Sequence, residues 1–173
     1  VTGVLCDWDL SSAVDDDGVV ISSNATHRTG TYPFLATELL TDKPPVHLYR
    51  HDLESFFYIL IWAGLHYSFS DEGAKYLVKD EVKIWMDAEH HGQAQDNKLA
   101  MITGVGSIAN RVFQQFHPDF QPLVEQWVIP LWQFFRSAFL KADTSVPSFG
   151  FDTAIASEFL TFENFMEALG EKP

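Results

Sequence analysis

The sequence predicts a mainly α-helical domain, a helical bundle around a buried central helix with a short β segment at the N-terminus. Two observations predict this fold class. Apolar residues recur at helical spacing through most of the chain, and within residues 53–66 no helical face is charged beyond Glu54 and its polar neighbour Ser55, which is itself uncharged. The 173 residues, of which 46% are hydrophobic, suffice for a sizeable core. No repeat or linker divides them, so we expect one domain over residues 1–173.

The N-terminal elements are predicted to be short. Residues 4–6 form an apolar run typical of a strand, and residues 19–21 predict a second strand within a polar, acidic loop. Pro33 suits a first helical turn and predicts a short helix to about Leu40. The central helix over 53–66 follows, with Asp52 as its N-cap, and we expect it to be buried on every side.

The rest of the chain is predicted to be helical, apart from a loose stretch over 143–157. We expect helices over 79–88 and 96–103, an amphipathic helix over 105–116, and a long helix over 118–141 that Pro130 kinks or splits. A last helix is capped by Thr161, turns Phe162, Phe165, Met166 and Leu169 inward, and is closed by Gly170.

The net charge limits the kinds of partner that we expect, and the cysteine content indicates the compartment. The net charge of −13 argues against nucleic acid and against an anionic membrane surface, since both are bound mainly by Lys and Arg. It favours a basic or neutral protein partner.

The longest apolar run, 56–65, is too short to span a bilayer. Cys6 is the single cysteine, which excludes an intrachain disulfide and fits an intracellular protein, cytoplasmic or nuclear.

Three segments in a fixed order carry the functional signal. Asp7 and Asp9 flank Trp8 after the first strand, where carboxylates could hold a divalent cation. Residues 30–40 read Gly-Thr-Tyr-Pro-Phe-Leu-Ala-Thr-Glu-Leu-Leu, and residues 50–58 read Arg-His-Asp-Leu-Glu-Ser-Phe-Phe-Tyr. Together they resemble the C-terminal lobe of a protein kinase, and most of all the fungal-type protein kinase domain. The resemblance is good from Val4 to about Trp62 and weaker beyond.

This resemblance implies a protein kinase-like C-terminal lobe from a serine/threonine kinase. Full-length members transfer phosphate from ATP, with magnesium, to protein substrates. Asp7 matches the aspartate that holds magnesium, and Trp8 matches the phenylalanine beside it. Asp9 replaces the usual glycine, and an aspartate adopts positive φ less readily. Thr31 matches the threonine that supports the catalytic aspartate and lysine near the substrate hydroxyl.

The resemblance also assigns structural and regulatory roles. Glu38 ends Ala-Thr-Glu where Ala-Pro-Glu is usual, and it would form a buried ion pair with Arg111 or Arg136. Asp52 matches the aspartate that begins the central helix and accepts hydrogen bonds from the catalytic loop. The activation loop corresponds to residues 11–29, whose candidate phosphorylation sites are Ser22, Ser23, Thr26 and Thr29.

Several kinase parts do not occur in this sequence. A Gly-rich loop, a strand lysine and a His-Arg-Asp catalytic loop are missing, and in the family they precede the position of Asp7. We therefore expect a partial domain without N-lobe and catalytic loop, inactive alone and without bound ATP or magnesium. Two alternatives stay open. One is a non-catalytic, pseudokinase-like helical interaction module; the other is a His-Asp metal phosphohydrolase that uses His27, His51, Asp52 and Asp96.

Overall fold

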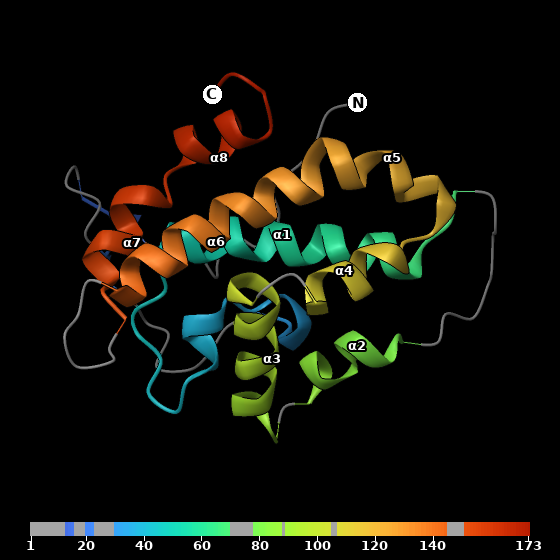
Figure 1. The fold of residues 1–173 in the computed structure, drawn as a ribbon. Helices are drawn as coiled ribbons and strands as arrows, with labels where there is room; N and C mark the ends of the chain where they lie inside the picture. Colours follow the sequence, from blue (N-terminus) through green and yellow to red (C-terminus); the bar gives the residue numbers. More distant parts are fainter. Residues whose placement is uncertain are drawn as a thin grey trace.

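The structure, a computed structural model, describes residues 13–15, 20–22, 30–69, 78–87, 89–104, 107–144 and 151–173. It is mainly helical, as the sequence predicts (Figure 1). The predicted strand over 4–6 lies outside the described residues. No helix in the described ranges has both the length and the apolar character needed to cross a membrane.

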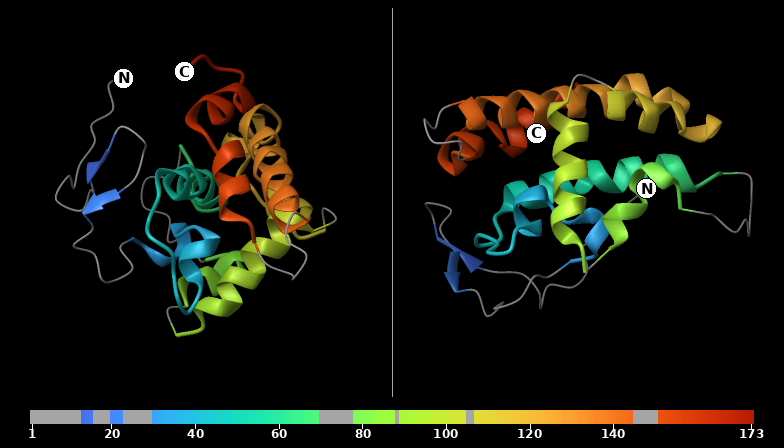
Figure 2. Two further views of the ribbon diagram at one scale, coloured as in Figure 1. Left: turned by 90° about the vertical axis from the view of Figure 1, so that its left-hand side faces the viewer. Right: turned by 60° about the horizontal axis from the view of Figure 1, so that its bottom comes forward.

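Two long helices form the centre of the bundle. Helix α1, Tyr49–His66, and helix α6, Ile129–Thr144, run side by side, and α3, His91–Thr103, crosses them (Figures 1 and 2). The Phe57 ring of α1 lies 5.4 Å from the Phe135 ring of α6, and both side chains are fully buried. Aromatic side chains thus pack between the two helices.

Helix α1 differs from its prediction at its start and on one face. It begins at Tyr49, so Asp52 lies inside the first turn and is not the N-cap. The Leu48 N–H instead donates to the His51 Nδ1 atom at 3.0 Å. The helix is also not buried all round, because Tyr49, Phe56 and Ile59 are 55%, 55% and 43% exposed. The elements packed on α1 cover its other faces and leave this one open.

The N-terminal part contains a small hairpin and two short 3₁₀ helices. Strand β1, Ala13–Val14, pairs antiparallel with β2, Val20–Ser22, which confirms the strand predicted near residues 19–21 (Figure 2). The single helix predicted over 33–40 is wrong. Elements η2, Tyr32–Phe34, and η3, Thr37–Leu40, replace it because Leu35 and Ala36 between them have extended backbone angles.

The remaining short elements follow the predicted order. They are α2, Asp80–Lys83; η4, Ile84–Met86; α4, Ser107–Gln114; η5, Pro118–Phe120; α5, Gln121–Leu123; η6, Val124–Val128; α7, Thr153–Phe159; and α8, Phe162–Ala168. Helix α4 buries Ala109, Val112 and Phe113, as its amphipathic pattern predicts. Helix α7 falls in the stretch predicted to be loose. Asp152 caps it by accepting hydrogen bonds from the Ala154 and Ile155 N–H groups.

The long helix predicted over 118–141 is interrupted before its proline. Element η6 is a π-helical turn in which the Ile129 N–H donates to the Val124 carbonyl oxygen, five residues back. Pro130 follows directly and has no N–H to continue the ladder. The wider π-helical turn therefore lies directly before the residue that has no backbone N–H to donate.

Helix α8 confirms its predicted cap and stop. The Thr161 Oγ1 atom accepts from the Asn164 N–H at 3.2 Å, and Gly170 follows the helix at φ 75°. Phe165 is buried, but Phe162 is 45% exposed, against the prediction that it faces inward. Phe162 is the first residue of this short helix and lies at the edge of the bundle.

Helix α1 comes close to the residues that follow α4 at Gly64. A Cβ atom at this position would lie 2.3 Å from the Phe116 ring, so a larger residue would force the ring or the helix to shift. The Gly64 carbonyl oxygen accepts a hydrogen bond from the His117 N–H at 2.7 Å.

Candidate functional site: the polar cluster beneath residues 30–41

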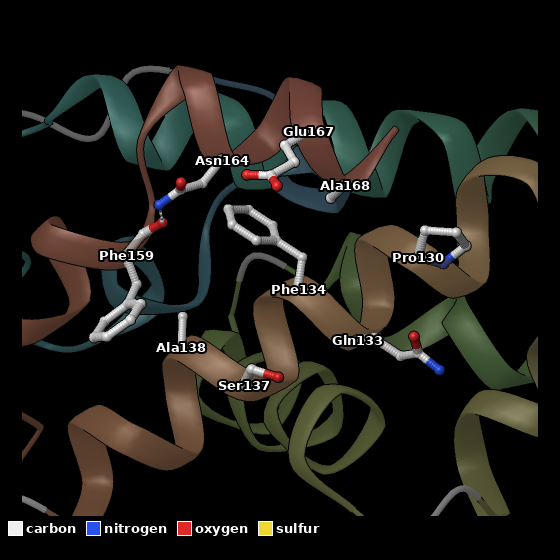
Figure 3. Close-up of a pocket in the computed structure, with 9 residues that line it drawn as sticks. All are labelled: Pro130, Gln133, Phe134, Ser137, Ala138, Phe159, Asn164, Glu167 and Ala168. Atoms are coloured by element: carbon white, nitrogen blue, oxygen red, sulfur yellow. Dashed lines mark hydrogen bonds between the residues drawn. The ribbon is translucent and has the colours of Figure 1, made fainter. Parts of the chain in front are cut away.

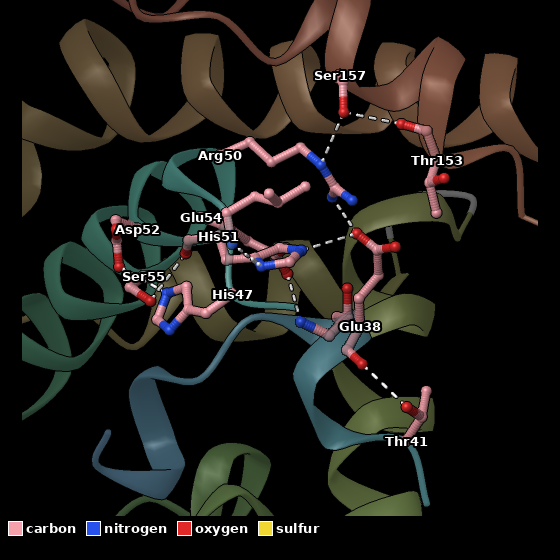
Figure 4. Close-up of polar contacts among 12 residues, drawn as sticks. Glu38, Thr41, His47, Arg50, His51, Asp52, Glu54, Ser55, Thr153 and Ser157 are labelled. Carbon is pink, nitrogen blue, oxygen red and sulfur yellow. Dashed lines mark hydrogen bonds and ion pairs between the residues drawn. The ribbon is translucent and has the colours of Figure 1, made fainter. Parts of the chain in front are cut away.

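Residues 30–41 are held in place mostly by other parts of the chain. Their own backbone hydrogen bonds are few and short in range, such as Phe34 N–H to Thr31 O at 2.8 Å. Buried apolar side chains of this segment pack with Ala94 of α3. Polar side chains that contact this segment or one another form what we name the anchor cluster: Glu38, Arg50, His51, Glu54, Tyr58 and Lys98. Figure 4 shows the first four of them.

Glu38 is the carboxylate that joins the segment to the start of α1. Its Oε2 atom accepts hydrogen bonds from the Arg50 Nη1 and, at 3.1 Å, from the His51 Nε2 (Figure 4). Because the Leu48 N–H donates to His51 Nδ1, the neutral ring carries its proton on Nε2, which can then donate to Glu38. Burial raises the pKa of Glu38, but the hydrogen bonds from His51 and Arg50 outweigh this and leave the pKa below its usual value.

The arginine partner of Glu38 differs from both candidates named from the sequence. Arg111 is exposed on α4, and the Arg136 guanidinium on α6 lies 5.5 Å from the Trp132 ring centroid. The partner is Arg50, only 2% exposed, which the sequence analysis placed ahead of the central helix. Its Nε atom also donates to Ser157 Oγ at 3.1 Å, which connects α1 to α7.

Glu54 forms the second connection to the segment. Its Oε1 atom accepts from the backbone N–H of Thr37 at 2.9 Å and from the Tyr58 hydroxyl at 2.7 Å. The side chain is fully buried, and this burial raises the pKa of Glu54 despite the two hydrogen bonds. Burial, with Glu54 nearby, also raises the pKa of Tyr58 well above its usual value.

Lys98 forms the third connection, from α3. Its Nζ atom donates to the Leu35 carbonyl oxygen at 2.6 Å and lies 4.0 Å from the Tyr58 ring centroid. The side chain is fully buried, which lowers the pKa of Lys98 to about 7, although Glu54 opposes this. Glu54 and Lys98 therefore hold the backbone of residues 35 and 37 from two helices. This arrangement can fix the position of the backbone around residues 35 and 37.

The other residues singled out from the sequence do not join this cluster. Asp52 is exposed and pairs with His47 at 2.9 Å. Thr31 is exposed just before η2, and its carbonyl oxygen accepts a hydrogen bond from the Phe34 N–H. For Ser22 the structure describes only the backbone, in β2. Asp7, Trp8, Ser23, Thr26 and Thr29 lie outside the described residues.

The described residues hold no ready metal site. Among them, no three His, Cys, Asp or Glu side chains come together in a way that could hold a metal ion. His51 is engaged by Glu38 and Leu48, and Asp52 by His47. His27, which the phosphohydrolase alternative needs, and Asp7, the expected magnesium ligand, lie outside the described ranges.

Of the anchor cluster, only Glu38 was assigned a structural role from the sequence. Arg50, Glu54 and Tyr58 were not assigned one, and Lys98 was not singled out at all. A signal for it exists, since Lys98 shares a helical face with Ala94, Met101 and Ile102, all of which are buried. A lysine in the middle of an apolar face needs an acceptor or a counter-charge. The sequence alone does not show that Leu35, 63 residues earlier, supplies that acceptor.

Comparison with known proteins gives one match. Residues 1–63 match the family model described as "Fungal protein kinase". No curated protein and no solved structure matches the chain. The match covers the opening motif, residues 30–41 and nearly all of α1, and so includes every member of the anchor cluster except Lys98.

Proposed function

We propose that the chain is the C-terminal lobe of a fungal-type serine/threonine kinase, on the support of the match between residues 1–63 and the fungal protein kinase family model. In this proposal the anchor cluster fixes residues 30–41 as part of the platform that receives a protein substrate. The supporting observation is that Glu54 and Lys98, both fully buried, are bound to the backbone of that segment. Burying two ionisable groups is costly, so their placement points to a segment whose position matters.

The individual roles follow the family resemblance. Asp7 would hold magnesium, which neutralises phosphate charge when it is bound. Thr31, exposed at the start of the anchored segment, would stand beside the substrate hydroxyl. Ser22, Ser23, Thr26 and Thr29 would be acceptors of regulatory phosphate ahead of the segment. Glu38 would keep the segment on α1 through Arg50 and His51.

The 173 residues by themselves are proposed to bind neither ATP nor magnesium tightly. Their sequence contains no Gly-rich loop, no strand lysine and no His-Arg-Asp catalytic loop, so Asp7 would act without a nucleotide cradle. Calorimetry of the purified chain with ATP and magnesium should show no binding. Micromolar affinity would contradict this part of the proposal.

A fusion protein tests the kinase assignment. Residues 1–173 are placed behind the first half of a fungal-type kinase domain that ends after its His-Arg-Asp loop, and transfer of radiolabelled phosphate from ATP to serine/threonine peptides is measured. We expect transfer that Asp7→Asn abolishes and Glu38→Gln reduces. Glu89→Gln is the matched control, because it makes the same side-chain change at an exposed carboxylate outside residues 30–41, and it should leave transfer unchanged.

Two outcomes would overturn the assignment. One is a fusion that unfolds cooperatively but transfers no phosphate. The other is transfer that Asp7→Asn leaves intact, since the metal-holding carboxylate would then be elsewhere.

The pseudokinase-like interaction module is supported by a different observation. Tyr49, Phe56 and Ile59 form an exposed apolar stripe on α1, and such surfaces often receive partners. A folded but inactive fusion, in which Tyr49 and Phe56 are nevertheless protected from hydroxyl-radical labelling by the added half, would favour this function.

A further inference from the structure

The described part of the chain contains an open cavity that none of the anchor-cluster residues lines. Its volume is about 540 Å³, and it lies where α6, the end of α7 and α8 meet (Figure 3). The residues around it are Pro130, Gln133, Phe134, Ser137, Ala138, Phe159, Asn164, Glu167 and Ala168. This volume falls within the usual range for ligand pockets and exceeds that of one side chain.

The walls of the pocket combine an aromatic floor with one carboxylate. Phe134 points into the pocket from α6, and the Glu167 carboxylate on α8 is turned toward its ring (Figure 3). The side-chain amide of Asn164 is fixed because its Nδ2 donates to the Phe159 carbonyl oxygen at 2.9 Å. An apolar ring beside a carboxylate suits a ligand with a hydrocarbon stem and a cationic end.

Acidic side chains outnumber basic ones around the pocket, where one basic side chain, Lys141, lies against the lining residue Phe159. Glu167 is the only charged residue among the nine that line it. Glu163 and Glu171 stand four residues before and after it, Glu158 precedes the lining residue Phe159, and all three are exposed. The whole chain carries a net charge of −13. This field attracts basic partners and repels acidic ones.

The chain itself shows the expected mode of contact. The Lys141 Nζ atom lies 3.7 Å from the centroid of the Phe159 ring, so one aromatic side chain of the pocket already carries an ammonium group on its face. The Phe134 ring packs edge-on against Phe135 and Phe165, at centroid distances of 5.0 and 6.2 Å, which holds it in place beside Glu167. Phe134 and Glu167 are thus arranged for a second cation.

We propose that this pocket binds a basic segment of a partner protein. The hydrocarbon part of a lysine or arginine side chain of that segment lies against Phe134, and its cationic end pairs with the Glu167 carboxylate. A neighbouring apolar side chain of the segment fills the space toward Ser137 and Ala138. This proposal does not depend on the kinase assignment, because none of these residues belongs to the matched region 1–63.

Fluorescence anisotropy with the whole 173-residue chain tests the proposal. The probe is a fluorescein-labelled Ala-Leu-Arg-Phe-Lys-Leu-Ala peptide, and the comparison peptide has Gln in place of Arg and Lys. We expect Glu167→Gln to weaken binding of the basic peptide about three- to fivefold, as the loss of one partly exposed ion pair does. Ser137→Trp, at an exposed position, should block the pocket and abolish binding.

The matched control is Glu163→Gln. It removes the same charge from the same helix at a residue that does not line the pocket, so affinity should change less than about twofold. Amide chemical shifts should move on peptide addition at Phe134, Ser137 and Glu167. Equal weakening by Glu163→Gln and Glu167→Gln, binding of the Gln peptide as tight as that of the basic one, or full binding to Ser137→Trp would each overturn the proposal.

Discussion

The buried ammonium group of Lys98 donates to the carbonyl oxygen of Leu35 at 2.6 Å, across 63 residues of sequence. Helix α3 thereby holds the segment that α1 holds through Glu54 and through the Arg50 and His51 contacts with Glu38. Three contacts from two helices define the position of a segment that has little regular structure of its own.

Replacing Lys98 by methionine should destabilise the fold. The substitution leaves the Leu35 carbonyl oxygen unsatisfied and removes the positive charge near the buried Glu54, at a cost of about 2–4 kcal/mol at pH 7. Urea unfolding followed by circular dichroism measures the change. Lys83→Met on α2, where the side chain is exposed, is the control and should change stability by about 0.5 kcal/mol or less. Equal effects of the two substitutions would contradict the anchoring role of Lys98.

The contribution of Lys98 should depend on pH with a defined sign. Its pKa is lowered from 10.5 to about 7 in the folded protein, so between these values the unfolded state binds more protons. Stability attributable to Lys98 therefore rises as pH increases above about 7 and is flat below it, with a slope of at most about 1.4 kcal/mol per pH unit. The difference in unfolding free energy between the wild type and Lys98→Met, measured from pH 6 to 9.5, reports this slope. A difference that stays constant would mean that the ammonium group keeps its ordinary pKa.

Replacing Glu38 by glutamine should loosen residues 30–41. The change removes the charge that Arg50 and His51 share, and Arg50 is buried, so we expect a loss of about 1–3 kcal/mol. Hydrogen exchange at the Thr37 and Leu39 amides should accelerate more than at amides in the middle of α6. Glu89→Gln makes the same change at an exposed carboxylate outside the segment and should leave these rates unchanged. Unchanged exchange in Glu38→Gln would show that the apolar contacts with Ala94 suffice to hold the segment.

Two glycine substitutions should have opposite signs. Gly64→Ala would place a Cβ atom 2.3 Å from the Phe116 ring and should cost about 1–3 kcal/mol. Gly92→Ala, on α3, meets no atom within 4 Å and should stabilise the protein by about 0.5–1 kcal/mol through the lower entropy of the unfolded chain. Thermal unfolding of the two variants side by side decides the matter. A tolerated Gly64→Ala would mean that Phe116 can turn away without loss of packing.

The helical fold could be predicted from sequence because its signals are local. The amphipathic face of α4 and the Thr161 cap depend on residues within one or two turns. The start of α1 could not be predicted in the same way. Asp52 is a good N-cap by type, but the imidazole of His51 satisfies the Leu48 N–H and moves the start forward to Tyr49.

The anchor cluster was predicted only in part because its partners are distant in sequence. Glu38 was identified through the family resemblance, yet its arginine was sought late in the chain, while Arg50 stands twelve residues away. Lys98 gives no family signal here, and its acceptor is a backbone atom that any residue would provide. Patterns of side-chain type do not reveal such backbone acceptors.

Pro130 connects helix regularity to the shape of a surface. It follows the π-helical turn Val124–Val128, and it also forms one wall of the cavity between α6 and α8. A substitution at this position that restored the missing backbone donor would at the same time change the cavity wall. The hydrogen bonding of this helix and the shape of the cavity therefore depend on the same residue, so a change that alters one also alters the other.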